Sequence, residues 1–335
     1  MNKFNIAVIG ATGSVGRLFV TLLEEKSYLI RNIFLFASKD SLGKEINFHE
    51  KKLKIQDLSQ IDFQDLDIVF FCTNSDIVKK YYKSAIQNSC IIIDKSSLFR
   101  LDPNIPLLIP EINFNLIQDS FSRNMIISNP NCCVIILSLV LFPLHKIFKI
   151  KRLVISTYQS VSGAGNDALD ELFNQTRSKL SFSEIDIKSF PFQIAFNIIP
   201  FIGKIDDTGN CEEESKIKEE IQKIISTDIK ISVTSVRVPV FISHSMSVNI
   251  EFWENFGNIS SIKDILYNAP SIEVIEDEND CTPIFVANKE NIFVSRIRVD
   301  ESQANSINLW ISGDNLKKGA ALNAIQILEK ISKIY

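Results

Sequence analysis

The stretch Lys3-Phe4-Asn5-Ile6-Ala7-Val8-Ile9 runs directly into Gly10-Ala11-Thr12-Gly13-Ser14-Val15-Gly16. The first part is typical of a buried strand, and the residues after Gly16 have the apolar spacing of an amphipathic helix. A glycine turn between a strand and a helix lets the backbone approach the pyrophosphate of a dinucleotide, which the helix N-terminus faces. The spacing is G-x-x-G-x-x-G rather than G-x-G-x-x-G, so a purely structural turn remains an alternative at this point.

Further apolar strands follow at Ile33–Ala37, Asp67–Cys72 and Cys90–Asp94, and residues Val78–Gln87 suit a helix. Regular alternation of strands and helices predicts an α/β fold with a Rossmann-like, doubly wound parallel sheet. Ligands bind at the loops after the carboxyl ends of such strands, and Arg100 lies in one of these loops. A surface salt bridge is the alternative interpretation of Arg100.

The loop after the second strand, Ser38-Lys39-Asp40-Ser41, gives conflicting indications about a dinucleotide. Rossmann-type folds place the residue that meets the adenosine ribose here. Asp40 would accept from the 2′-hydroxyl of NAD, whereas Lys39 would favour the 2′-phosphate of NADP. A solvated loop with no ligand role is equally compatible with these residues.

A second informative stretch is Ile126-Ile127-Ser128-Asn129-Pro130-Asn131-Cys132-Cys133, followed by an apolar run to Leu141. Asn131 is a favourable N-cap residue, so the thiol of Cys132 is expected in the first turn of a helix. Thiols in that position titrate below their free value and act as nucleophiles. The alternative is a small apolar residue buried at a strand–helix junction.

After Cys132 the pattern changes to polar/apolar alternation, at Leu153–Ser160, Ile231–Phe241, Met246–Phe252 and Asn291–Val299. These segments predict a second, α+β domain built on a mixed sheet with helices on one face. We place a dinucleotide-binding domain at residues 1–129, completed by a C-terminal helix within 315–335. Residues 130–314 are the expected catalytic and dimerisation domain.

The composition excludes several classes of function. A net charge of −4 over 335 residues argues against nucleic-acid binding, and no apolar run is long enough to cross a membrane. The strand pattern begins so early that a signal peptide is not expected, which favours a cytoplasmic protein with reduced thiols. The six cysteines show no C-x-x-C pair or zinc-ligand spacing, so no metal site is expected.

The chain has three histidines, and His244 is the one in a polar, glycine-free turn beside a strand end. A thiolate nucleophile needs a group that manages protons near neutral pH, and histidine does this best. A nucleotide motif, a cysteine at a helix start and a late histidine together describe a dehydrogenase of aldehydes or acyl phosphates. A purely structural His244 is the alternative.

Seven motifs, in the same order, resemble the aspartate-β-semialdehyde dehydrogenase family over nearly the whole chain. They are Gly10–Gly16, Asn129–Cys132, Ser156–Gly165, Ile194–Asn197, Glu213–Lys216, Val236–Pro239 with His244-Ser245, and Asp314–Ala321. The resemblance implies an NADP-dependent homodimer, or a dimer of dimers, that reduces L-β-aspartyl phosphate to aspartate semialdehyde in lysine (diaminopimelate), threonine and methionine biosynthesis.

The resemblance also implies roles for individual residues. Cys132 matches the family nucleophile, His244 the acid/base, and Gln159 the residue that orients the substrate. The substrate-binding set is Arg237 for the carboxylate, Glu213 for the ammonium, Arg100 and Lys216 for the phosphate, and Asn131 beside the nucleophile. The cofactor set is Gly10, Thr12, Gly13, Ser14, Val15, Asp40, Ser41, Ser162, Gly163 and Asn315.

Two positions depart from the family pattern. The family typically has an arginine where Asp40 stands, so either Lys39 compensates in binding NADP or NAD is tolerated. Cys133 replaces a residue that is usually serine, and it is either inert or a redox partner of Cys132.

Two other functions remain open at this stage. A related acyl-phosphate reductase, such as N-acetyl-γ-glutamyl-phosphate reductase, shares the chemistry but should not need Glu213 for a free ammonium. A non-catalytic dinucleotide-binding sensor is the alternative from another class.

Overall fold

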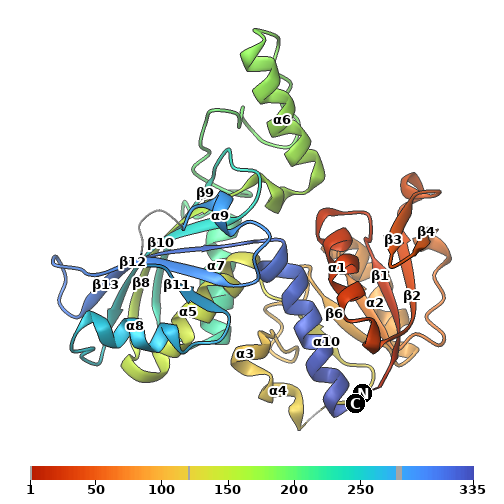
Figure 1. The fold of residues 1–335 in the computed structure, drawn as a ribbon, viewed down its shortest axis with the longest axis horizontal. Helices are drawn as coiled ribbons and strands as arrows, with labels where there is room; N and C mark the ends of the chain where they lie inside the picture. The colour runs from red at the N-terminus through yellow and green to blue at the C-terminus, as the bar shows by residue number, and fades with distance from the viewer. Residues whose placement is uncertain (1, 120, 277–280) are drawn as a thin grey trace. The chain divides into compact units, whose positions relative to one another are not determined.

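The structure is a computed structural model that describes residues 2–119, 121–276 and 281–335. It separates into two compact units. The first comprises Met1–Asn131 and Ala320–Tyr335, and the second comprises Cys132–Gly319. Figure 1 labels the elements of both.

The first unit contains a sheet of seven strands in the spatial order β3-β4-β2-β1-β5-β6-β7. The strands are β1 Phe4–Ile9, β2 Ile30–Ala37, β3 Glu45–Phe48, β4 Lys51–Asp57, β5 Ile68–Phe71, β6 Ile91–Asp94 and β7 Ile126–Ser128. The helices are α1 Ser14–Glu25, α2 Ser75–Gln87, α3 Pro110–Asn113, α4 Asn115–Gln118 and α10 Leu322–Ile334. Neighbouring strands are parallel except for the β3–β4 pair.

Both faces of this sheet are covered. Ile6 and Val8 of β1 pack into one apolar cluster with residues of α1 and α10, whereas Ala7 and Ile9 pack into another with α2. Successive residues of a strand point to opposite faces, so the uninterrupted apolar run of β1 is explained by burial on both sides. The predicted doubly wound sheet is therefore confirmed.

The antiparallel hairpin of β3 and β4 was not predicted from the sequence. Its residues are rich in lysine, and most of those in β4 are at least partly exposed, because the hairpin forms the edge of the sheet. Charged edge strands lack the apolar signal on which the prediction of strands depends.

The glycines at positions 10, 13 and 16, after β1, differ in why the fold needs them. Gly10 has a φ of +85°, and a Cβ there would lie 2.6 Å from the carbonyl oxygen of Cys72. A Cβ on Gly16 would lie 2.1 Å from the carbonyl oxygen of Gly10. At Gly13 the nearest atom would be 3.5 Å away, an ordinary contact. The fold thus requires glycine at 10 and 16, but gives no steric reason for glycine at 13.

The second unit contains a six-stranded sheet in the order β11-β12-β13-β10-β8-β9. The strands are β8 Ile150–Gln159, β9 Lys230–Arg237, β10 His244–Phe252, β11 Ile272–Val274, β12 Ile292–Val299 and β13 Ser306–Gly313. The helices are α5 Cys132–Phe148, α6 Asn166–Leu180, α7 Glu212–Ile224, α8 Ile259–Tyr267 and α9 Pro283–Val286, with a π-helical turn at Lys317–Ala321. The pairs β8–β9 and β11–β12 are parallel and the others antiparallel, which confirms the predicted mixed sheet.

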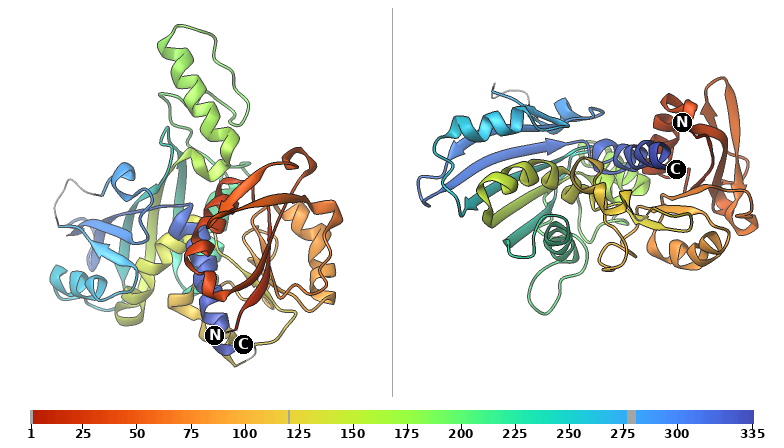
Figure 2. Two further views of the ribbon diagram at one scale, coloured as in Figure 1. Left: turned by 45° about the vertical axis from the view of Figure 1, so that its right-hand side comes forward. Right: turned by 90° about the horizontal axis from the view of Figure 1, so that it is seen from below.

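Helix α5 is the central helix of this unit, because it packs on α7, α8, β8 and β13. Its residues Cys133–Leu141 are all buried, which accounts for an apolar run without an amphipathic period. Helix α6 extends away from the sheet of its own unit (Figure 2). None of the described helices is long and apolar enough to cross a membrane.

Several strand boundaries differ from those expected, and two of them lie at the site. Strand β9 ends at Arg237 rather than Phe241, where Pro239 lacks the N–H that a ladder needs. His244 is the first residue of β10 rather than part of a turn. Strand β13 was not predicted from the sequence.

We expect Gly16→Ala to destabilise the protein strongly, because a methyl group cannot fit 2.1 Å from the Gly10 carbonyl oxygen. Overpacking of this kind costs about 1–3 kcal/mol or more. Gly13→Ala is the matched control and should leave the unfolding midpoint nearly unchanged. Denaturant unfolding of both variants measures this, and equal stabilities would contradict the interpretation of Gly16.

Candidate functional site

The site of the second unit is organised by three adjacent strands, β10, β8 and β9. Gln159 ends β8 and pairs in register with Arg237, which ends β9. Tyr158 of β8 pairs with Ser245 of the antiparallel β10, next to His244. The strand register therefore gathers Gln159, Arg237 and His244 at one edge of the sheet, although they are far apart in the sequence.

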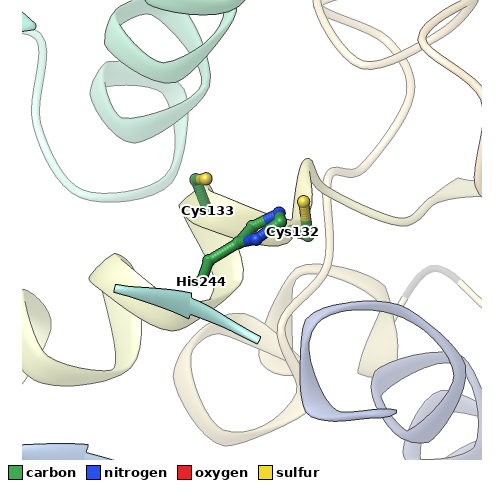
Figure 3. A group of neighbouring side chains, drawn as sticks. All are labelled: Cys132, Cys133 and His244. Carbon is green, nitrogen blue, oxygen red and sulfur yellow. The ribbon is translucent and has the colours of Figure 1, made fainter. Parts of the chain in front are cut away.

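The thiol of Cys132 reaches this edge from helix α5. Cys132 is the first residue of α5, as the sequence predicted, and is half-buried. The sulfur atoms of Cys132 and Cys133 and one ring nitrogen of His244 all lie within 4.8 Å of one another. Figure 3 shows the ring of His244 extending from β10 toward Cys132. A thiol and an imidazole at this separation can exchange a proton after a small side-chain movement.

The ring of His244 is fully buried and held by Ser160. The backbone N–H of Ser160 donates to Nδ1 at 3.0 Å, and the Ser160 hydroxyl lies 3.1 Å from the same atom. Because Nδ1 accepts an N–H, the neutral ring carries its proton on Nε2. Nε2 itself has no hydrogen-bond partner among the described residues, so its N–H is available to a substrate oxygen.

The amide of Gln159 has one defined orientation. The hydroxyl of Thr157 donates to Oε1 of Gln159 at 2.9 Å, and Nε2 of Gln159 donates to Glu213 at 3.1 Å. Thr157 and Gln159 are two residues apart on β8 and so share a face of the strand. These hydrogen bonds hold the carboxylate of Glu213, on α7, next to the end of β8.

Arg237 is the buried cation of the site. Only 6% of its surface is exposed, and its Nη1 donates to the carbonyl oxygen of Ser160 at 2.6 Å. Burial lowers the pKa of its guanidinium, while the carboxylate of Glu213 and the sulfur of Cys132 oppose that shift. A buried guanidinium of this kind is well suited to bind a carboxylate bidentately.

Cys133 differs from Cys132 in its surroundings. It is fully buried, and this burial, followed by its hydrogen bond with Cys132 and the charge of Glu213, raises the pKa of the Cys133 thiol. Arg237 acts in the opposite direction. At neutral pH Cys133 is therefore a protonated thiol beside the sulfur of Cys132.

Two glycines make room for these groups. A Cβ on Gly163 would lie 3.2 Å from Nη1 of Arg237 and 3.5 Å from Nε2 of His244. A Cβ on Gly319 would lie 3.0 Å from the Cβ of Cys132. The contacts at 3.2 and 3.0 Å are tighter than ordinary packing, so side chains at these positions would crowd Arg237 and Cys132.

Asn315 and Ser162 lie beside the His244 ring. Oδ1 of Asn315 accepts from the backbone N–H of Ser243 at 2.9 Å and from the hydroxyls of Ser160 and Ser162 at 3.2 and 3.1 Å. The side chain of Asn315 is almost fully buried. The expected cofactor contacts of Ser162, Gly163 and Asn315 stay predictions, and the structure adds a role for the first and last in holding Ser160.

Lys216 lies on α7, three residues after Glu213. Its ammonium is 3.7 Å from a carboxylate oxygen of Glu212, and its side chain is about one-third exposed. This partner is one that an incoming anion can displace, because exposed ion pairs are weak.

The remaining predicted residues belong to the first unit. The hydroxyls of Thr12 and Ser41 are 3.2 Å apart, which brings the turn after β1 next to the loop after β2. Asp40 is exposed within that loop. Arg100 is buried, and its Nη2 donates to the carbonyl oxygen of Lys95 at 2.7 Å, next to Asp94. The other members of this set are Gly10, Gly13, Ser14 and Val15 around the start of α1, and Asn131, buried immediately before α5.

Three residues that support the site were not predicted from the sequence, namely Thr157, Ser160 and Ser243. All three lie within or beside the motifs quoted above, but each acts through a backbone group or through another side chain. The period-2 spacing of Thr157 and Gln159 was the one available signal for them.

Comparisons with known proteins agree with this geometry. Residues 5–120 match the family model described as semialdehyde dehydrogenase, NAD binding domain, and residues 141–318 match that of the semialdehyde dehydrogenase dimerisation domain. The aspartate-semialdehyde dehydrogenase of Rickettsia conorii is 50% identical over 336 residues, with 99% of each chain covered. The Bacillus subtilis protein of the same name is 37% identical, with 98% of each chain covered.

A solved structure shows the same fold. The crystal structure of Vibrio cholerae aspartate semialdehyde dehydrogenase II complexed with ASA matches with a TM-score of 0.96 and 36% sequence identity. The match covers 100% of both chains. The two-unit architecture is therefore shared with an enzyme solved with its ligand.

We expect iodoacetamide at neutral pH to label Cys132 before any other thiol. Cys132 is half-exposed and adjoins the positive charge of Arg237, whereas burial raises the pKa of Cys72 and Cys90 to about 12 and raises that of Cys133 as well. Peptide mass spectrometry after brief labelling measures the order. Labelling of Cys72 and Cys90 should become rapid only as the pH rises toward 12, and earlier modification of Cys133 would contradict this picture.

Proposed function

Because the chain belongs to the aspartate-semialdehyde dehydrogenase family, we propose that it reduces L-β-aspartyl phosphate to L-aspartate 4-semialdehyde with NADPH, through a thioester on Cys132. The observation that carries this proposal is the grouping of the Cys132 sulfur with the His244 ring, beside the buried Arg237 and Glu213. The product would serve lysine, threonine and methionine biosynthesis. A cytoplasmic location stays a prediction from the sequence.

The covalent step uses the thiolate of Cys132. Its position at the first residue of α5 and the charge of Arg237 favour the anion. Attack on the acyl phosphate forms a carbon–sulfur bond and expels inorganic phosphate, which leaves the aspartyl group as a thioester. The bound nicotinamide supplies the hydride that reduces this thioester to a thiohemiacetal.

His244 manages the proton of the thiohemiacetal oxygen. Its Nε2 is the ring atom without an internal partner in the described chain, so it is the donor available to that oxygen. When the ring carries protons on both nitrogens, Nδ1 no longer accepts from the Ser160 N–H, and the Ser160 hydroxyl, 3.1 Å away, becomes the acceptor for its proton. Collapse then releases the aldehyde and restores the thiolate. Acid–base assistance of this kind is typically worth about 10²–10⁴-fold in rate.

The two charged ends of the aspartyl group have matching partners. Arg237 would bind the α-carboxylate, since the loss of hydration that lowers its pKa is compensated by a bound anion. Glu213 would bind the ammonium, and Gln159 holds that carboxylate in place. Asn131, next to the nucleophile in the chain, would contact the reacting acyl group, and Arg100 and Lys216 are the proposed phosphate ligands.

The turn after β1 fits the pyrophosphate of a dinucleotide. Glycine at position 13 has no steric explanation within the fold, and close approach of a ligand to the backbone would explain it. Gly10, Gly13 and the residues Thr12–Val15 at the start of α1 would hold the phosphates, and Asp40 and Ser41 would face the ribose. Asp40 would repel a 2′-phosphate, so NADP is proposed with NAD tolerated; Ser162, Gly163 and Asn315 would contact the nicotinamide side.

We also propose the domain division 1–129 with 315–335 and 130–314, and a homodimer formed by the second domain. The support for the dimer is apolar surface on and beside α6, where Phe173, Leu180 and Phe182 are 57%, 70% and 99% exposed. Exposed apolar side chains that gather on a projecting element are typical of a protein–protein interface.

The test of this function is steady-state reduction of β-aspartyl phosphate with NADPH and with NADH, side by side. Turnover of N-acetyl-γ-glutamyl phosphate instead would identify the related reductase, and cofactor binding without any turnover would identify a sensor. We expect Cys132→Ala to abolish turnover while the cofactor still binds. The neighbouring thiol of Cys133 should not replace it as nucleophile, because it is fully buried and its pKa is raised. Cys281→Ser, in a separate apolar cluster, is the control; substantial activity of Cys132→Ala would exclude the covalent mechanism.

We expect Arg237→Lys to raise KM for β-aspartyl phosphate at least about tenfold, because an ammonium cannot replace a bidentate guanidinium. The exposed Arg152 on β8 supplies the matched control, Arg152→Lys, which should keep the KM of the unmodified enzyme. An unchanged KM in Arg237→Lys would mean that Arg237 does not bind the carboxylate.

A further inference from the structure

We propose that Cys132, Cys133 and His244 form a binding site for a thiophilic divalent cation such as Zn²⁺, which blocks the enzyme by occupying its nucleophile. The proposed reaction involves no metal ion, and the metal site depends on Cys133, for which that reaction gives no role. It rests on the proposed function only in that Cys132 is the nucleophile that the cation removes.

The distances between the three ligand atoms fit a metal site. Two sulfurs and a ring nitrogen lie within 4.8 Å of one another, and Figure 3 draws the three side chains that carry these atoms. In a tetrahedral zinc site with ordinary bond lengths the ligand atoms are roughly 3.5–3.8 Å apart. Side-chain movements of about 1 Å therefore suffice to bring these three atoms around one ion.

His244 offers a nitrogen that has no hydrogen-bond partner among the described residues. Nε2 belongs to a fully buried side chain, lacks a hydrogen-bond partner in the described chain, and lies on the part of the ring nearest Gly163. To bind a metal, Nε2 must offer its lone pair, which moves the ring proton to Nδ1. A protonated Nδ1 no longer accepts from the backbone N–H of Ser160, now 3.0 Å away, so metal binding exchanges that hydrogen bond for one from Nδ1–H to the Ser160 hydroxyl, 3.1 Å away. A hydrogen-bond acceptor of this kind is the usual outer partner of a metal-bound histidine.

The charges of the surrounding groups are compatible with a bound divalent cation. A divalent cation bound by two thiolates is neutral as a group, and the nearby Arg237 and Glu213 balance each other. Binding replaces the thiol protons with the metal, releases them to solvent and involves no transfer of electrons. The high pKa of the free Cys133 thiol is no obstacle, because a coordinated thiol is deprotonated by the metal.

The ligand set selects the class of cation. Two sulfurs and an imidazole are the donors of Cys₂His zinc sites, which keep a fourth position for water. Magnesium and calcium prefer oxygen ligands and should not compete. The half-exposed side chain of Cys132 provides the entry, since Cys133 and His244 are both fully buried.

The experiment is a titration of the metal-free, reduced protein with Cd²⁺, followed by thiolate-to-metal absorbance, and with Zn²⁺ in competition with a chromophoric chelator. We expect one ion per chain in the unmodified protein and in Cys281→Ser. Cys133→Ser should lose at least about tenfold in affinity, since even indirect partners of a metal contribute 10–100-fold. In the same samples, Zn²⁺ but not Mg²⁺ should inhibit turnover, and a chelator should reverse the inhibition.

Two outcomes would overturn the proposal, namely no stoichiometric binding by the unmodified protein, or equal affinity in Cys133→Ser. If Cys133→Ser does not fold, His244→Gln replaces it, and retention of full affinity there counts equally against the site. The absorbance titration needs no substrate, so a failure of the proposed reaction would leave this result intact.

Discussion

The hydrogen bond from the backbone of Ser160 to Nδ1 of His244 is the interaction on which the site depends. It joins the residue after β8 to the ring of His244 on β10 and leaves Nε2 without a partner among the described residues. The hydroxyl of the same serine is tied to Asn315 and Ser162, so the position of the ring is determined by segments from three parts of the second unit. A histidine placed only by an exposed loop would have no such constraint.

The second requirement of the site is glycine at positions 163 and 319. Gly163 and Gly319 are in contact distance of the atoms that react, and the absence of their side chains is what lets a guanidinium, an imidazole and a thiol share one small volume. That crowding also brings the neutral thiol of Cys133 next to the nucleophile. The same packing that serves catalysis thereby assembles three metal-binding atoms, so one arrangement accounts for both the proposed reaction and its proposed inhibition.

Much of the fold could be predicted because many of its strands and helices have clear local sequence patterns. The doubly wound sheet followed from apolar strands separated by helices, and the start of α5 at Cys132 followed from Asn-Pro-Asn before an apolar run. The β3–β4 hairpin was missed because charged residues at the side of the sheet weaken the apolar signal, and β9 was made too long because a proline soon after Arg237 ends the ladder. Strand β13 was also missed, although it lies inside its sheet and has no charged residues.

The sequence by itself determined which chemical groups are present: a cysteine at a helix start, a glycine turn after a strand, and a histidine, arginine and glutamate inside recognisable motifs. Only the tertiary structure decided that Gln159, Arg237 and His244 meet at one sheet edge, that Ser160 sets the proton of the ring, and that Cys133 points into the site. The reason is physical. Helix and strand preferences act over a few neighbouring residues, whereas strand register and side-chain packing join residues that are many tens of positions apart.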